Sequence, residues 1–223
     1  MGRTKRAAHL LFPQKVLRWV ENTEKRGIGM PLITPPNYKD IPPNAPLVFL
    51  IGPIQGTSDW QSPAAWWLLD RLPNLFVASP RSKMWREDLP CTEKDRLYKV
   101  QTHWEHTYIR EVMNRVIDPP KGVARAAIVA FCAKEEVHDP SRAFAQTTRY
   151  EIGKILGWIN GRLGRDIFLN SDRLELPDGV FIGAHPDYFG RRYLENDLIS
   201  EGRQLYSTIE EVCGKTFEYL HGK

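Results

Sequence analysis

The sequence has few cysteines and no long apolar run. Its 223 residues include three cysteines, at positions 91, 132 and 213, and none is in a Cys-x-x-Cys pair. An odd count at these spacings argues against a disulfide framework or a zinc knuckle and is typical of reduced intracellular thiols. No apolar stretch approaches the ~18 residues that a membrane-spanning helix needs, and no apolar signal core follows the basic start. We therefore expect a cytoplasmic protein with no membrane partner.

Short motifs of common cofactor and hydrolase sites are also missing. The segment from Gly52 to Gly56 follows an apolar run, but it is neither a Gly-x-Gly-x-x-Gly dinucleotide motif nor a phosphate-binding P-loop. The chain has no Gly-x-Ser-x-Gly nucleophile elbow and no His-Glu-x-x-His zinc motif. Cys132 has no histidine that can be placed beside it, so we interpret it as structural. We expect no cofactor and no metal.

The charge balance is only mildly basic. Lysine and arginine number 31 against 27 acids, which leaves a net charge of +4 and a pI of about 8.9. This excess can suit a small anion but is too weak to indicate nucleic-acid binding. The most basic segment, 81–99, alternates its cations with acids, so nucleic-acid binding through it is the weakest of our hypotheses. With 42% hydrophobic residues, the composition is that of an ordinary globular protein.

The pattern divides the chain into two regions. Residues 1–45 form an N-terminal extension, in which 12–26 has helical spacing and a proline-rich connector follows that cannot be helical. Residues 46–223 form the main domain, with strands predicted at 47–51, 75–78, 126–131, 167–169 and 180–182. Helices are predicted at 58–71, 97–117, 147–160 and 207–220, and the first and last open on capping boxes that begin at Ser58 and Ser207. Alternating strands and helices predict an α/β sandwich around a mostly parallel sheet, with ligands beyond the carboxyl ends of the strands.

Two acids lie on the apolar stripes of predicted helices. Glu151 shares a face with Ile155 and Ile159, and Glu105 begins the stripe that continues through Ile109. An acid among apolar side chains is costly unless it is paired or functional, and two carboxylates at one sheet edge can cleave a glycosidic bond. The alternatives stay open. Glu151 can close a capping box with Thr148, and Glu105 can be a solvated residue or the partner of a cation.

Four further residues are candidates for substrate contact. Asp59 can accept hydrogen bonds from a base or sugar, and Trp60 or Trp104 can stack on a flat ring. Arg81 follows the second strand, where it can meet an anionic group. Each has a structural alternative: a helix-start acid for Asp59, core packing for either tryptophan, and a surface charge for Arg81.

Taken in order, these residues resemble the nucleoside 2-deoxyribosyltransferase-like family, in its branch with Trp-Glu and Thr-Arg-Tyr-Glu motifs. The resemblance covers roughly residues 47–195. It rests on five segments in the expected order, together with a closing segment over 183–192. The five are the strand ending in Gly52-Pro53-Ile54, the Asp59-Trp60 pair, Ser79-Pro80-Arg81, Trp104-Glu105-His106 and the run from Thr148 to Gly153.

The resemblance implies a flavodoxin-like three-layer sandwich with a five-stranded parallel sheet. It implies that Glu151 is the nucleophile on the anomeric carbon of a nucleoside, and that Glu105 holds the sugar or positions that nucleophile. It also places the loop with Gly52 and Ile54, the Asp59-Trp60 pair and Thr148 around the substrate. By the same resemblance we expect a homo-oligomer, at least a dimer.

The chain departs from the family where well-known members carry a base-contacting acid, because Ala145 stands six residues before Glu151. Our leading hypothesis is cleavage of the N-glycosidic bond of (deoxy)nucleosides or nucleotides through Glu151, with glycosyl transfer to another base or to water. Such an enzyme would serve purine or pyrimidine salvage. The alternative is a non-catalytic nucleotide-binding or sensing domain that retains the pocket.

Overall fold

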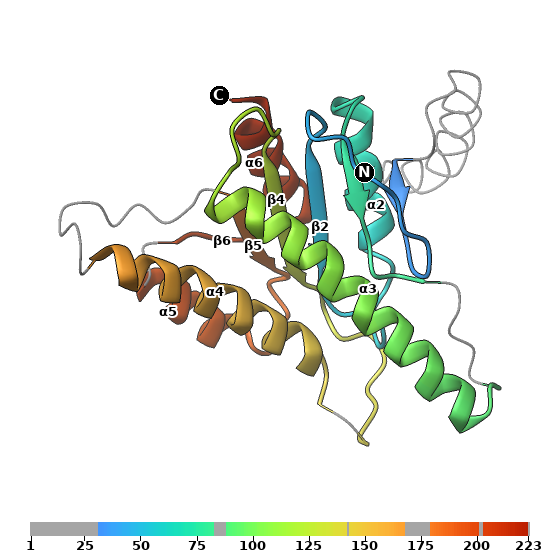
Figure 1. Ribbon diagram of the computed structural model, residues 1–223. Helices are drawn as coiled ribbons and strands as arrows, with labels where there is room; N and C mark the ends of the chain where they lie inside the picture. Colours follow the sequence, from blue (N-terminus) through green and yellow to red (C-terminus); the bar gives the residue numbers. More distant parts are fainter. Residues whose placement is uncertain (1–30, 83–87, 142, 168–178, 201–202, 223) are drawn as a thin grey trace, which may run out of the picture.

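Six parallel strands form one sheet in the order β1-β3-β2-β4-β5-β6 (Figure 1). The computed structural model describes residues 31–82, 88–141, 143–167, 179–200 and 203–222, so the helix predicted at 12–26 lies outside the described residues. The strands are β1 (Leu32–Ile33), β2 (Leu47–Ile51), β3 (Phe76–Ala78), β4 (Ala126–Cys132), β5 (Val180–Ala184) and β6 (Leu205–Tyr206).

The predicted fold class is confirmed. Strands β2 to β6 follow the flavodoxin-like order, in which the first strand of the set lies between the second and the third. The two central strands β2 and β4 are buried along their whole length, because helices cover both faces of the sheet. They pair from Leu47 opposite Ala126 to Ile51 opposite Ala130.

The strands differ from the prediction in three places. β1 lies in the proline-rich connector and adds an edge strand beside β3, with Leu32 opposite Val77. The strand predicted at 167–169 is wrong at Ile167, which ends a helix, and its other two residues lie outside the described part of the chain. β6 instead pairs with β5, opposite Ile182 and Gly183.

Helices cover the sheet in two layers (Figure 1). On one face, α3, α4 and α5 enclose a core that includes Phe49, Trp104 and Ile155. On the other face, α2 and α6 enclose a core that includes Trp60, Phe131 and Val212. Within the described ranges, no helix combines the length and apolar character needed to cross a membrane. The helices are α2 (Gln61–Arg71), α3 (Cys91–Ile117), α4 (Gln146–Ile167), α5 (Arg191–Ser200) and α6 (Ile209–His221).

Helix ends depart from the sequence prediction by one turn or less, except at α3 and α4. Asp59 rather than Ser58 accepts from the start of α2, through the Ser62 amide at 3.0 Å. The capping box of α6 is formed by Thr208 and Glu211, one residue beyond the predicted pair. α3 begins six residues earlier than predicted, and α4 continues past Gly161 to Ile167. A glycine inside a helix costs only about 1 kcal/mol, so it does not have to end one.

Residues 31–45, which we call the strap, run from the sheet edge along the side of α3 that carries Trp104 and Tyr108. Because β1 is parallel to β3, the chain leaves Ile33 at the carboxyl edge of the sheet. The strap then returns beside α3 and enters β2 from the opposite edge. It contains no helix, as predicted for a proline-rich segment, and its two ends bury Ile33 and Ala45.

Candidate active site

Two loops meet where the strand order reverses between β2 and β4. Backbone amides of Glu136 and Val137, in the loop after β4, donate to the carbonyl of Gly56, in the loop after β2. Gly56 has φ of +75°, and a Cβ atom there would lie 2.9 Å from the Val137 carbonyl oxygen. The close approach therefore requires glycine. In open α/β sheets this edge is where ligands bind.

Glu151 lies in the second turn of α4, the helix that follows the loop after β4. Its predicted apolar stripe is confirmed, since Ile155 and Ile159 are both almost completely buried. The capping-box alternative is wrong, because α4 begins at Gln146 and both Thr148 and Glu151 lie inside the helix. The Thr148 hydroxyl has no hydrogen-bond partner. Glu151 is thus a partly buried acid without a capping role.

Glu105 lies on α3, which packs on the same face of the sheet as α4. The apolar stripe that it begins is confirmed by the burial of Ile109, Val112 and Val116. Its carboxylate accepts a hydrogen bond from the Gln101 amide nitrogen at 2.8 Å, one helical turn earlier. The structure gives Glu105 no lysine or arginine partner within the described residues.

The two acids influence each other. Burial, with a smaller contribution from the nearby charge of Glu105, raises the pKa of Glu151 to about 8, and Lys154 opposes this rise. Burial also raises the pKa of Glu105, and the hydrogen bond from Gln101 opposes that rise. An environment that disfavours ionisation, next to a second carboxylate, is how active sites tune acids toward neutral pH.

The start of α4 holds two unusual features close to Glu151. Thr148 is 1% exposed and its Oγ1 has no partner, which is uncommon for a buried hydroxyl. Ala145, just before the helix, has φ of 54°, a conformation that non-glycine residues rarely adopt. Strained backbone and unpaired polar groups concentrate at functional sites. Ala145 itself is buried and offers no polar atom from its side chain.

Arg81 and Asp59 are paired with each other. The Arg81 Nε lies 3.0 Å from Oδ1 of Asp59, and the same nitrogen donates to the Gln61 side chain. Another nitrogen of Arg81 contacts the carbonyl oxygens of Ile54 and Ser58 at 3.3 Å. Arg81 thus fastens the loop after β2 in its folded shape. Substrate contact by Asp59, Arg81 or Ile54 stays a prediction.

Both candidate tryptophans belong to the core. Trp60 is 3% exposed, packs against Phe131 and donates from Nε1 to the Pro53 carbonyl at 3.1 Å. A Cβ atom at Gly52 would lie 2.3 Å from the Trp60 ring, so this glycine makes room for the tryptophan. Trp104 is fully buried between Phe49 and Tyr108. The core alternative describes both side chains, while their contact with a substrate stays a prediction.

Two partners of the acids and one neighbouring segment carry no signal that singles them out in the sequence. Gln101 acts on Glu105 and Lys154 acts on Glu151, while the strap contacts Trp104 next to Glu105. Gln101 and Lys154 follow from helical spacing, at four residues before Glu105 and three after Glu151. The strap contacts were not visible, because they join segments almost 70 residues apart.

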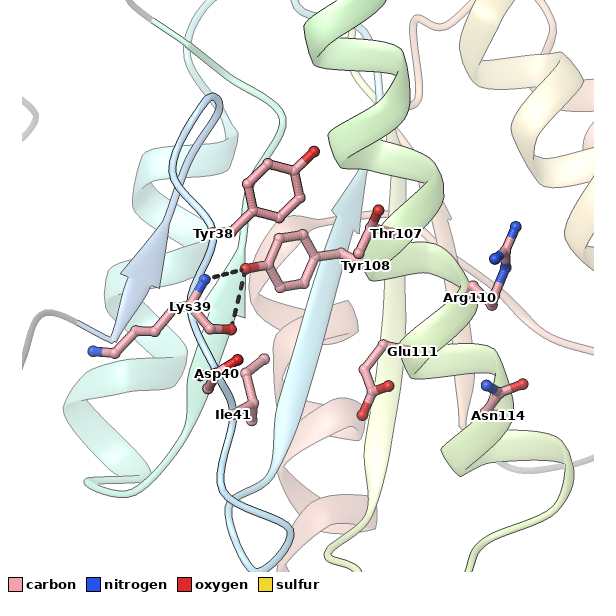
Figure 2. A pocket seen from close by; sticks show the side chains of 9 residues that line it. All are labelled: Tyr38, Lys39, Asp40, Ile41, Thr107, Tyr108, Arg110, Glu111 and Asn114. Atoms are coloured by element: carbon pink, nitrogen blue, oxygen red, sulfur yellow. Dashed lines mark hydrogen bonds between the residues drawn. The ribbon is translucent and has the colours of Figure 1, made fainter.

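A separate groove of about 550 Å³ lies between the strap and the outer side of α3 (Figure 2). Neither Glu105 nor Glu151 lines it. Its walls mix cations with acids, and the hydrogen bonds between Tyr108 and Lys39 close one side. The groove lining is Tyr38, Lys39, Asp40, Ile41, Thr107, Tyr108, Arg110, Glu111 and Asn114.

Comparisons with known proteins leave the family open. No family model matches the chain. No curated protein matches it either. In the part of the chain that the structure describes, no group of three or more histidines, cysteines, aspartates or glutamates is placed to hold a metal ion. The chemistry of the site must therefore be argued from Glu105, Glu151 and their surroundings.

Proposed function

We propose that the protein cleaves the N-glycosidic bond of (deoxy)nucleosides or nucleotides through Glu151 and transfers the glycosyl group to another base or to water. The observation that carries this proposal is the pair of partly buried acids, Glu105 and Glu151, whose charges interact on the sheet face beside the strand reversal. Two carboxylates at close range are the usual machinery for breaking glycosidic bonds. The motif resemblance described above points to the same chemistry.

In the proposed reaction, the Glu151 carboxylate attacks the anomeric carbon of the sugar. A carbon–oxygen bond forms to Glu151 while the carbon–nitrogen bond breaks, and the base leaves with that electron pair and takes up a proton. The resulting glycosyl ester is then attacked by water or by a second base, which releases the Glu151 carboxylate. Glu105 holds the sugar or orients Glu151 throughout.

Glu151 has to lose its proton before it can attack. A pKa of about 8 means that the ligand-free protein holds Glu151 mainly protonated at neutral pH. The burial that disfavours the carboxylate also makes it more reactive once formed, because fewer water molecules solvate it. The cationic character that develops on the sugar in the transition state stabilises two adjacent carboxylates that repel each other in the free protein.

A panel of nucleosides and 5′-nucleotides tests the proposal. Purified wild-type protein is incubated with each compound and free base is measured by chromatography. We expect base release from at least one substrate class, and a loss of 10³-fold or more in the Glu151→Gln variant, because an amide cannot form the ester. Glu218→Gln is the matched control, since Glu218 is exposed on α6 across the sheet.

The same panel separates the alternatives. Near-normal turnover in Glu151→Gln would remove Glu151 from the catalytic role. Tight binding of a nucleotide with no base release from any compound would instead favour the sensing domain. A homo-oligomer, at least a dimer, is part of the proposal by resemblance alone, and sedimentation velocity measures it.

A further inference from the structure

The strap is hydrogen-bonded to the turn of α3 that carries Glu105. Nε1 of Trp104, the residue before Glu105, donates to the Asn37 carbonyl at 2.6 Å. The Tyr108 hydroxyl, one turn later, accepts from the Lys39 amide at 2.9 Å and donates to the Lys39 carbonyl at 3.4 Å. Figure 2 shows this double contact between the strap and α3. Glu105 therefore lies between two anchors to the same segment.

The part of α3 that precedes Glu105 packs little against the domain. Between Cys91 and His103, Leu97 is the one buried residue, whereas half of the residues from Trp104 to Ile117 are buried. Glu105 lies at the boundary between the exposed N-terminal part of α3 and the part that packs on the sheet. A helix end with few buried contacts opens and shifts more easily than the packed remainder. The strap supplies two polar anchors at that point.

Both ends of the strap are fixed to the domain. At its start, β1 pairs with β3 and the Ser82 hydroxyl donates to the Pro35 carbonyl at 3.1 Å. At its end, the buried Arg115 guanidinium donates to the Ala45 carbonyl at 2.9 Å. Because β1 and β2 hold the strap on either side, its middle keeps its position when the single Arg115 contact is lost.

We propose that the strap is a positioning element for Glu105, and that Tyr108 and Trp104 are the positioning residues through which it acts. This inference rests on the proposed function, since it assigns a role to the acid beside Glu151. In this role both residues act through the position of Glu105 and not through contact with the substrate. Their hydrogen bonds hold the Glu105 turn at the distance from α4 at which the two carboxylates interact.

Tyr108→Phe tests the inference, because it removes the hydroxyl and leaves the ring packed against Trp104. Arg115→Met is the matched control. It removes one hydrogen bond at the far end of the same strap, ten residues or about 15 Å along α3 from Glu105, where β2 still holds the chain. We expect both variants to unfold a few degrees below wild type.

The deciding readout is the titration of the Glu151 carboxyl, followed by carbon-13 NMR and assigned with Glu151→Gln. The charged groups that act on Glu151 are Glu105 from α3 and Lys154 from α4. When the Glu105 turn loosens, its repulsion of Glu151 weakens and the pKa of Glu151 falls. We expect this fall in Tyr108→Phe and in Glu105→Gln, and an unchanged titration in Arg115→Met.

The effect of Tyr108→Phe on enzyme activity is measured in a separate experiment. On any substrate found by the panel, we expect Tyr108→Phe to lower kcat about tenfold with little change in KM, since small misplacements of catalytic groups act mainly on rate. An unchanged Glu151 titration in Tyr108→Phe, or an equal shift in Arg115→Met, would overturn the positioning role. A shifted titration in a protein that releases no base would instead refute the proposed function and leave the strap's effect on Glu105 established.

Discussion

Glu151 and Glu105 differ from Glu93 and Asp187 in the direction of their pKa shifts. Arg96 lowers the pKa of Glu93, and Lys134 lowers the pKa of Asp187, because each cation stabilises the charged carboxylate. Burial raises the pKa of Glu105 and Glu151. Among the described carboxylates, the raised values therefore fall on the pair that the sequence singled out.

This difference predicts the pH dependence of the reaction. If Glu151 is the nucleophile, its ionised form is the active one, so kcat/KM should rise with pH and level off above about 8. Well below that value the rise should be about tenfold for each pH unit. Initial rates between pH 5.5 and 9.5 measure it. A rate that falls as pH rises through 8 would mean that protonated Glu151 acts as an acid.

Stability gives an independent check on the same proton. The ordinary pKa of a glutamate is 4.5, so between pH 4.5 and 8 the folded state retains a proton that the unfolded state has lost. Raising the pH through this range therefore destabilises the wild-type protein. Glu151→Gln lacks this penalty and should gain on wild type by a few kcal/mol, in order of magnitude, between pH 5 and 9. Urea unfolding at the two pH values measures it, and a pH-independent difference would contradict the raised pKa.

At the scale of elements, the loop after β2 and helix α4 use glycine for opposite reasons. A Cβ atom at Gly52 would lie 2.3 Å from both the Phe131 carbonyl oxygen and the Trp60 ring. A Cβ atom at Gly157, on the exposed side of α4, would meet nothing within 4 Å. The first glycine is required by packing, whereas the second only weakens its helix.

The two glycines therefore predict opposite effects of the same substitution. Gly52→Ala should lower the free energy of unfolding by about 1–3 kcal/mol or more, because backbone and a buried ring must move. Gly157→Ala should raise it by about 0.5–1 kcal/mol through helix propensity. Chemical denaturation of the two variants measures both. A neutral Gly52→Ala would contradict the tight contact between the loop after β2 and the end of β4.

At the scale of the whole molecule, the fold decides what surrounds Glu151. The strand order brings the loops after β2 and β4 together, and α3 and α4 carry the two acids on one face of the sheet. The buried side chain of Ala145, six residues before Glu151, offers the departing base no polar contact. A site with fewer polar contacts discriminates less between bases.

We therefore expect broad base tolerance and strong competition of hydrolysis with transfer. The glycosyl ester on Glu151 is resolved by whichever acceptor is present, and a weakly held base leaves sooner. Incubation of a nucleoside with a second, labelled base, followed by chromatography, measures the two products. Labelled nucleoside without net free sugar would contradict this expectation. It would direct attention to Asp59 and the acids at 135–139 as base contacts.

The sequence by itself determined the elements whose signals are local. The apolar runs at 47–51 and 126–131 predicted the strands β2 and β4, and the spacing of branched apolar residues after Glu105 and Glu151 placed each acid on a buried stripe. These patterns depend only on the period of a strand or helix, which neighbouring residues reveal. The α/β sandwich followed from the order of the elements, and its strand order was expected from the motif resemblance.

Only the tertiary structure decided the partners of these residues. Trp60 and Trp104 pack in cores formed by elements that are far apart in the sequence. Arg81 forms an ion pair with Asp59, which lies 22 positions earlier in the sequence. The proline-rich connector contains strand β1 and the rest of the strap, because it forms hydrogen bonds with the edge of β3 and with side chains of α3. Such contacts join segments that are far apart in the chain, so the local periodicity of apolar residues cannot predict them. Burial, which raises the pKa of Glu151, exists only once the helices pack on the sheet.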